Sequence, residues 1–219
     1  ATSIRDLVVH DADIVVGTHG RSFWILDDVS ALRQMDGGGP GTAARLFAPD
    51  SAVRVRWNMN TDTPLPPDEP AGENPPDGAI IDYYLHADAK EVTLAITDGR
   101  GTVVRKYSSA DVVEPVNEKE LRFPAYWLRP AMTLPAKKGM HRFLWDLHYA
   151  PPDSLPRSYP IAAVYQNTAS STMGPWVLPG EYAVTLTVDG GSFRQPLTVR
   201  MDPRVRATPA ALTRTSATR

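Results

Sequence analysis

The 219-residue sequence contains no cysteine, which excludes disulfide bonds, thiolate nucleophiles and cysteine-ligated zinc sites. It also lacks a continuous apolar run of about 18 residues, the length that a membrane-spanning helix needs. With 23 basic and 25 acidic side chains the net charge is −2, which gives no field that would attract nucleic acid or an anionic membrane. These absences predict a globular protein with no membrane span and no nucleic-acid partner.

Metal-binding and nucleophilic motifs are missing as well. The five histidines form neither an H-x-H nor an H-E-x-x-H spacing, and no acidic cluster accompanies them: His10, His19, His86, His141 and His148. Ser22 and Ser192 lie near glycines but outside a G-x-S-x-G context. The glycine-rich residues 37–41 lack the Lys-Ser/Thr that completes a phosphate loop. No metal site and no cofactor is therefore expected.

Carboxylates do not form a catalytic pair either. Glycoside hydrolysis needs two carboxyl groups about 5–10 Å apart across a sugar site. Asp27 and Asp28 are adjacent, so on a strand they point to opposite faces. Asp146, between Trp145 and Leu147, is expected to be a structural carboxylate that either faces outward or is hydrogen-bonded. We expect no catalytic residue in this chain.

What the sequence does contain is strands. The clearest signal is residues 180–200, where four apolar side chains alternate with smaller or polar ones: Tyr182, Val184, Leu186 and Val188. Asp189-Gly190-Gly191 supplies residues that tolerate the positive φ of a hairpin turn. Pro196 in the second strand suggests a sheet edge or a bulge. The segment predicts a β-hairpin with one buried face.

Turn-separated strand patterns continue through residues 46–200, and the 21 prolines disfavour long helices. The expected strands, besides the hairpin, are residues 46–47, 53–57, 79–85, 91–97, 102–107 and 139–147. About six or seven strands without βαβ alternation predict an antiparallel, immunoglobulin-like β-sandwich. Trp57 and Trp145 are expected in its core, and residues 61–77, 108–139 and 148–179 are expected to be irregular.

The N-terminal residues predict a smaller unit. Three short apolar strands, at residues 7–10, 14–18 and 22–26, form a three- to four-stranded meander of the size of one propeller blade. A single blade cannot bury both of its faces, so it must pack on neighbours that this chain lacks or on the domain that follows. Trp24 is expected in its core. Asp28 is a plausible N-cap for a helical turn through Arg33, before a flexible linker at residues 36–41.

The fold class is therefore all-β, with an immunoglobulin-like sandwich after a blade-like meander. Residues 1–45 form a terminal propeller blade and linker, and residues 46–204 form the sandwich with its long proline-rich loops. Residues 205–219 form a tail in which Thr208-Pro209 starts a helix.

Several segments resemble one family. Residues 7–28 (LVVHDADIVVGTHGRSFWILDD) resemble the last blade of bacterial BNR-repeat, sortilin-like β-propeller proteins. Residues 78–85, 139–152 and 174–204 resemble the module that follows that propeller, and residues 94–107 are similar to the immunoglobulin-like domain of flagellar-hook capping proteins. Such proteins are often labelled glycosyl hydrolases, and the resemblance implies export from a bacterial cell. The S-x-D-x-G-x-x-W Asp-box is absent, however, and the hydrolase label transfers to no residue.

The resemblance and the missing catalytic motifs together favour a non-catalytic accessory module that contacts the remainder of its own propeller or a partner protein. Two alternatives remain open. One is a carbohydrate-binding module in which Tyr126, Trp127 or Trp176 stacks on sugar rings, although these loop aromatics can equally cover the sandwich edges. The other is the C-terminal part of a propeller glycoside hydrolase whose catalytic residues lie outside the chain.

Overall fold

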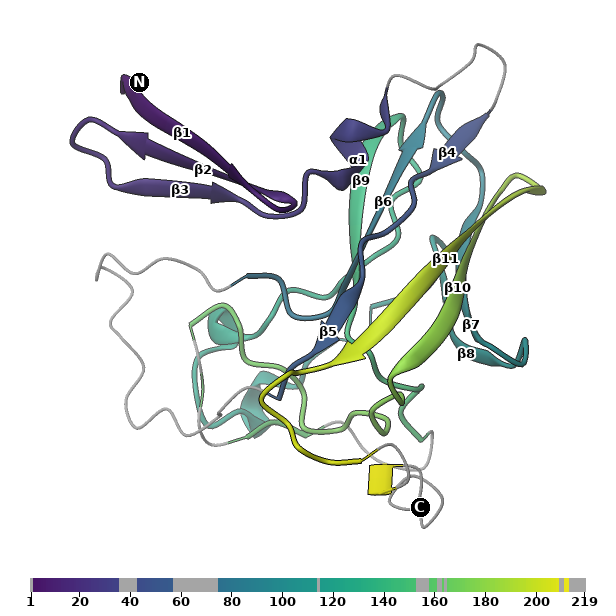
Figure 1. Ribbon diagram of the computed structural model, residues 1–219. Helices are drawn as coiled ribbons and strands as arrows, with labels where there is room; N and C mark the ends of the chain where they lie inside the picture. Colours follow the sequence, from purple (N-terminus) through teal and green to yellow (C-terminus); the bar gives the residue numbers. More distant parts are fainter. Residues whose placement is uncertain are drawn as a thin grey trace.

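Strands dominate the computed structural model, which describes residues 2–35, 43–56, 75–113, 115–152, 158–160, 163, 165–208 and 211–212 (Figure 1). These residues form three sheets, which confirms the all-β prediction. The strands are β1 (Ile4–His10), β2 (Asp13–Thr18), β3 (Phe23–Leu26), β4 (Ala44–Leu46), β5 (Ala52–Arg54), β6 (Ala79–Leu85), β7 (Val92–Asp98), β8 (Val103–Ser108), β9 (Gly139–Trp145), β10 (Gly180–Val188) and β11 (Gly191–Met201). The helical elements are short: α1 (Ser30–Arg33), η2 (Glu118–Glu120) and η3 (Ala125–Trp127).

Two of the sheets share one hydrophobic core, and we call them the two-sheet body. One sheet has the order β5-β11-β10-β7-β8, and the other has the order β4-β6-β9. Alternate residues of the strands point into the core, as period-2 patterns require. Large, fully buried members come from both sheets: Ile81, Tyr83, Phe143, Trp145, Leu94, Ile96, Leu186 and Leu197. The prediction that Trp145 is a core residue is therefore confirmed.

The hairpin predicted at residues 180–200 is present as β10 and β11. The two strands pair antiparallel from Gly180 opposite Val199 to Val188 opposite Gly191. Its four alternating apolar side chains are buried, and Asp189 and Gly190 adopt the positive φ that the turn requires. The bulge suggested by Pro196 is wrong, because the register is uninterrupted. Since β5 pairs with β11 only between Val199 and Met201, Pro196 lies beyond that pairing.

One local prediction needs correction. Val29, and not Asp28, is the N-cap residue of α1, because the helix begins one residue later than the sequence suggested. The Asp28 carboxylate still accepts a hydrogen bond from the backbone N–H of Ser30, at 3.0 Å. Trp57, the linker at residues 36–41 and most of the loop at residues 61–77 lie outside the described residues. Within the described part of the chain, no helix is long and apolar enough to cross a membrane.

Candidate functional site

The third sheet, formed by β1, β2 and β3, is apolar on both faces, and we call it the N-terminal sheet. Residues directly opposite each other in neighbouring strands share a face, and each face collects two such rows. One face carries Leu7, Val16, Trp24, Val9, Ile14 and Leu26. The other carries Val8, Val15, Ile25, Phe23, Gly17 and Asp6. Strands that are apolar on both faces are typical of sheets covered on both sides.

Neither face is covered by the residues that the structure describes. The N-terminal sheet projects away from the two-sheet body (Figure 1), and every residue of β1 and β3 is exposed. The prediction that Trp24 lies in a core is wrong, because its side chain is 63% exposed, and its indole N–H donates to the Arg21 carbonyl. Among the described residues, neither face of the sheet packs on the domain that follows it. Exposed apolar surface concentrated in this way is a common feature of interaction sites.

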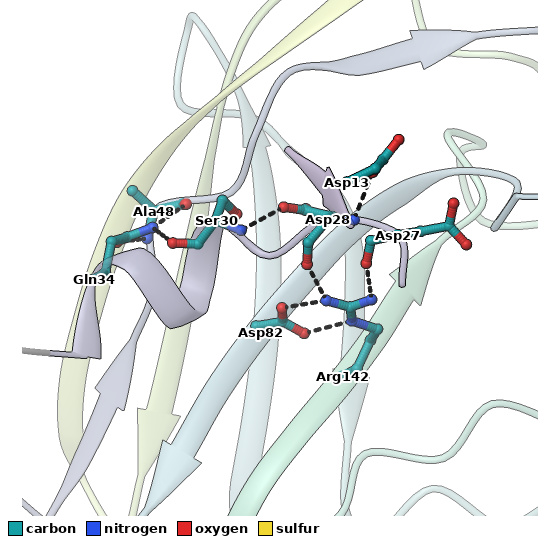
Figure 2. Close-up of polar contacts among 8 residues, drawn as sticks. All are labelled: Asp13, Asp27, Asp28, Ser30, Gln34, Ala48, Asp82 and Arg142. Atoms are coloured by element: carbon teal, nitrogen blue, oxygen red, sulfur yellow. Dashed lines mark hydrogen bonds and ion pairs between the residues drawn. The ribbon is translucent and has the colours of Figure 1, made fainter. Parts of the chain in front are cut away.

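Arg142 attaches this sheet to the two-sheet body. Its Nε and Nη2 donate to the two carboxylate oxygens of Asp82, at 2.9 and 2.8 Å. Its Nη1 and Nη2 also donate to the carbonyl oxygens of Asp27 and Asp28, at 2.7 and 2.6 Å (Figure 2). Asp27 and Asp28 directly follow β3, whereas Arg142 and Asp82 are register partners in β9 and β6. One guanidinium therefore ties the end of the N-terminal sheet to the body.

Arg142 and Asp82 stabilise each other's charge at this joint. Asp82 is only 4% exposed, and a buried carboxylate is tolerated where it is paired and hydrogen-bonded. Its hydrogen bonds raise the pKa of Arg142, which keeps the guanidinium protonated. Partial burial, and then repulsion by Asp13, raise the pKa of Asp27, whose carbonyl rather than carboxylate contacts Arg142.

Gln34 forms a second attachment. Residues 27–34 run from β3 along the body, and we call them the strap. At its end, the Gln34 amide donates to the Ala48 carbonyl at 3.0 Å and accepts from the Ala48 N–H at 2.9 Å (Figure 2). Between the two attachments, Val29 and Ala31 are buried. The strap is thus fixed to the body at both ends.

The three aromatic residues predicted to contact a ligand lie in two separate clusters. Tyr126 and Trp127, in η3, both pack edge-on against Tyr165, with ring centroids 6.1 and 6.3 Å apart. The Tyr126 side chain is 62% exposed. Trp176 instead stacks on the buried His148 ring at 3.9 Å, and the Arg54 guanidinium lies 5.4 Å from the Trp176 ring. The structure therefore brings Tyr126 and Trp127 together without Trp176.

Sequence reasoning missed the role of Arg142 and Asp82. A signal was available, because each is a charged residue within a largely apolar strand segment, and a charge in such a place needs a partner. Asp146 is placed as expected: its carboxylate accepts a hydrogen bond from the His148 N–H at 3.2 Å. Within the described ranges, no group of three or more His, Asp or Glu side chains is arranged to hold a metal ion.

Comparisons with known proteins do not add a family to this picture. No protein-family model matches the chain, and no match is found among curated proteins or solved structures.

Proposed function

We propose that this chain is a non-catalytic interaction module that docks through its N-terminal sheet onto other β-sheets, namely the remainder of a β-propeller in its own polypeptide or in a partner protein. The single observation that carries this proposal is a sheet with two apolar faces, both open to solvent. The resemblance of residues 7–28 to a terminal propeller blade supports the same partner.

The two open faces constrain what the partner must provide. A partner that covered one face would leave the other in water, so complete burial needs one apolar layer on each side. Neighbouring blades of a propeller provide this arrangement, because each blade packs between two others. The outer edge of β1, which is seven residues long, also offers backbone groups to a further strand.

The remaining features of the proposal concern the body and the location. We take the two-sheet body to be immunoglobulin-like, which its shared core and the buried Trp145 support. Its role would be to buttress the propeller or to contact a partner. Export from a bacterial cell is part of the proposal by resemblance alone.

A binding experiment tests the proposal. The reading frame upstream of Ala1 is determined, and the propeller blades that it encodes are produced separately and mixed with the 219-residue chain. We expect association measurable by calorimetry, and an affinity at least 100-fold weaker after Val8→Asp and Trp24→Asp, which place a charge on each face. Val103→Asp is the matched control, because Val103 is an equally exposed valine in β8 of the body. Binding that the face variants retain would contradict docking through the sheet. A reading frame without blades would exclude a propeller in the same polypeptide and leave only one in a partner protein.

A second candidate function is carbohydrate binding at Tyr126. Its exposed ring lies on a turn that is held in place by hydrogen bonds between the backbones of Trp127 and Thr168 and of Thr168 and Arg129. The Arg129 guanidinium and the Asn167 amide, hydrogen-bonded at 2.8 Å, are exposed on the same turns. An exposed aromatic ring beside polar side chains suits a sugar ring.

A glycan array distinguishes specific carbohydrate binding at Tyr126 from non-specific binding to the exposed apolar sheet. Specific binding that Tyr126→Ala abolishes, and that Phe23→Ala in the exposed N-terminal sheet leaves unchanged, would support a carbohydrate site. An array without any bound glycan would eliminate it.

A further inference from the structure

We propose that Arg142 is a positioning residue, which holds the N-terminal sheet in one direction so that docking places the two-sheet body at one defined position on the partner. This inference rests on the proposed docking function. It is carried by the hydrogen bonds of the strap. Figure 2 shows those of Arg142 with Asp27, Asp28 and Asp82, that of Asp28 with Asp13, and those of Gln34 with Ala48.

The first step is that the N-terminal sheet and the strap form one unit. Three hydrogen bonds join the strap to the β1–β2 turn and to Asp13, the first residue of β2. The backbone N–H of Asp28 donates to the Asp13 carboxylate at 2.9 Å, and the N–H of Val29 donates to the Ala12 carbonyl at 2.6 Å. The Arg33 guanidinium donates to the Asp11 carbonyl at 2.5 Å. A rotation of the sheet relative to the body must therefore carry the strap with it.

The second step is that this unit is attached to the body at both ends of the strap. Arg142 holds the peptide groups of Asp27 and Asp28, and Gln34 holds the backbone of Ala48. Two separated attachments fix the orientation of the sheet relative to the body, whereas a single attachment would allow the sheet to rotate about it. Loss of the Arg142 contacts would release the end of the strap next to the sheet, and the sheet would then be held only through the buried Val29 and Ala31 and the Gln34 end.

The third step concerns the choice of arginine. Four of the five N–H groups of Arg142 are used: two bind Asp82 and two bind the carbonyls of the strap. The planar guanidinium sets the angle between these two pairs, which a lysine ammonium cannot do. Since a buried ion pair is weak evidence for stability, its value here is in geometry. A sheet held in one direction also loses less conformational freedom when it docks.

The test measures the direction of the sheet in the free chain. Because the sequence has no cysteine, spin labels attach only at Arg21→Cys in the β2–β3 turn and Arg194→Cys in β11. Pulsed electron–electron double resonance then gives the distribution of the distance between the two spin labels. We expect a narrow distribution in the parent and one at least about twice as wide after Arg142→Lys, which keeps a cation beside Asp82 but loses the fork.

The matched control is Arg204→Lys. Arg204 forms the same kind of two-oxygen pair with the buried Asp202, at 2.9 and 2.6 Å, away from the strap. We expect this variant to keep the narrow distribution. If Arg142→Lys fails to fold, the double variant Asp82→Leu, Arg142→Met removes the whole pair without leaving a buried charge.

The width of the distance distribution decides whether Arg142 has the positioning role. A wider distribution in either Arg142 variant, with the control unchanged, supports the positioning role. A distribution that stays narrow in the folded Arg142 variant overturns it, even if the chain docks as proposed. Because no partner is present in this experiment, a failure of docking does not change the distance result, and the failure of one proposal can be distinguished from the failure of the other.

Discussion

Truncation of one leucine in the two-sheet body and one in the N-terminal sheet should reduce the free energy of unfolding by different amounts, because only the first is buried. Leu186, in β10, is fully buried in the two-sheet body, whereas Leu7, in β1, is 54% exposed. Leu186→Ala removes transfer free energy and leaves a cavity, so we expect a loss of about 3–4 kcal/mol in the free energy of unfolding. For a chain of this length that corresponds to a fall of about 10 °C in melting temperature.

Leu7→Ala should cost much less. Full burial of a leucine side chain contributes about 1.5–3 kcal/mol, and about half of the Leu7 surface is already in water. No cavity can form on an open face, so the expected loss is about 1 kcal/mol or less. Urea denaturation followed by circular dichroism, at low micromolar protein, measures both values.

The comparison has a clear refuting result. A loss of about 3 kcal/mol for Leu7→Ala would mean that its face is covered in solution. A repeat at tenfold higher concentration shows the source of that cover, because self-association makes the apparent stability depend on concentration. Equal losses at both concentrations would show that the chain itself covers the sheet, and the docking proposal would lose its basis.

Three further predictions follow from local chemistry. Burial lowers the pKa of His148 below its ordinary value of 6.5, so the unfolded chain binds the proton more tightly than the folded chain. The contribution of the neutral His148 to folding stability is therefore complete above pH 6.5 and is lost as the pH falls below it. The melting temperature should fall as the pH is lowered through 6.5, and it should fall less in His148→Gln. Gly78→Ala should abolish soluble expression, since the added Cβ would lie 2.2 Å from the Trp145 carbonyl oxygen. Gly101→Ala has open space around the added Cβ but a positive φ, so thermal melting should show a loss of about 1–2 kcal/mol in the free energy of unfolding. Asp189→Gly keeps the left-handed turn but loses two hydrogen bonds from the β6–β7 connection, so denaturation should show a loss of about 1–2 kcal/mol.

The strands could be predicted because their information is local. The segment 79–85 was predicted with the same bounds that β6 has, and the hairpin differs only at its ends. Alternation shows which side chains share a face, and residues with positive φ mark the turns. Neither signal depends on what the strand packs against.

Burial could not be predicted in the same way. Trp24 and Trp145 both lie in apolar strands, yet one is exposed and the other is buried. The difference is the presence of a second layer, which is a property of distant segments or of a partner. The sequence pattern therefore predicts that Trp24 lies in an apolar strand. It does not predict whether this chain contains the second layer that would bury it.

The joint was harder still to foresee. Arg142 and Asp82 are 60 positions apart, and a charged residue in each strand signals only that a partner is needed. The other two acceptors are the carbonyls of Asp27 and Asp28. Every residue has a carbonyl, so no side-chain pattern marks these two. The adjacent carboxylates attract attention in the sequence, whereas their backbone oxygens form the contact.

The joint and the open faces have one physical consequence in common. Three strands without a covered face bury little apolar surface, and such a sheet has little stability of its own. The strap joins the N-terminal sheet to the body through hydrogen bonds, where a covered sheet would have a shared core. A partner that covers both faces would add the burial that the sheet lacks. Binding and stabilisation of the sheet are then linked quantities, since a partner that binds only the ordered sheet raises its stability as its concentration rises. The tighter the joint holds the sheet beforehand, the less of the binding free energy is consumed in ordering it.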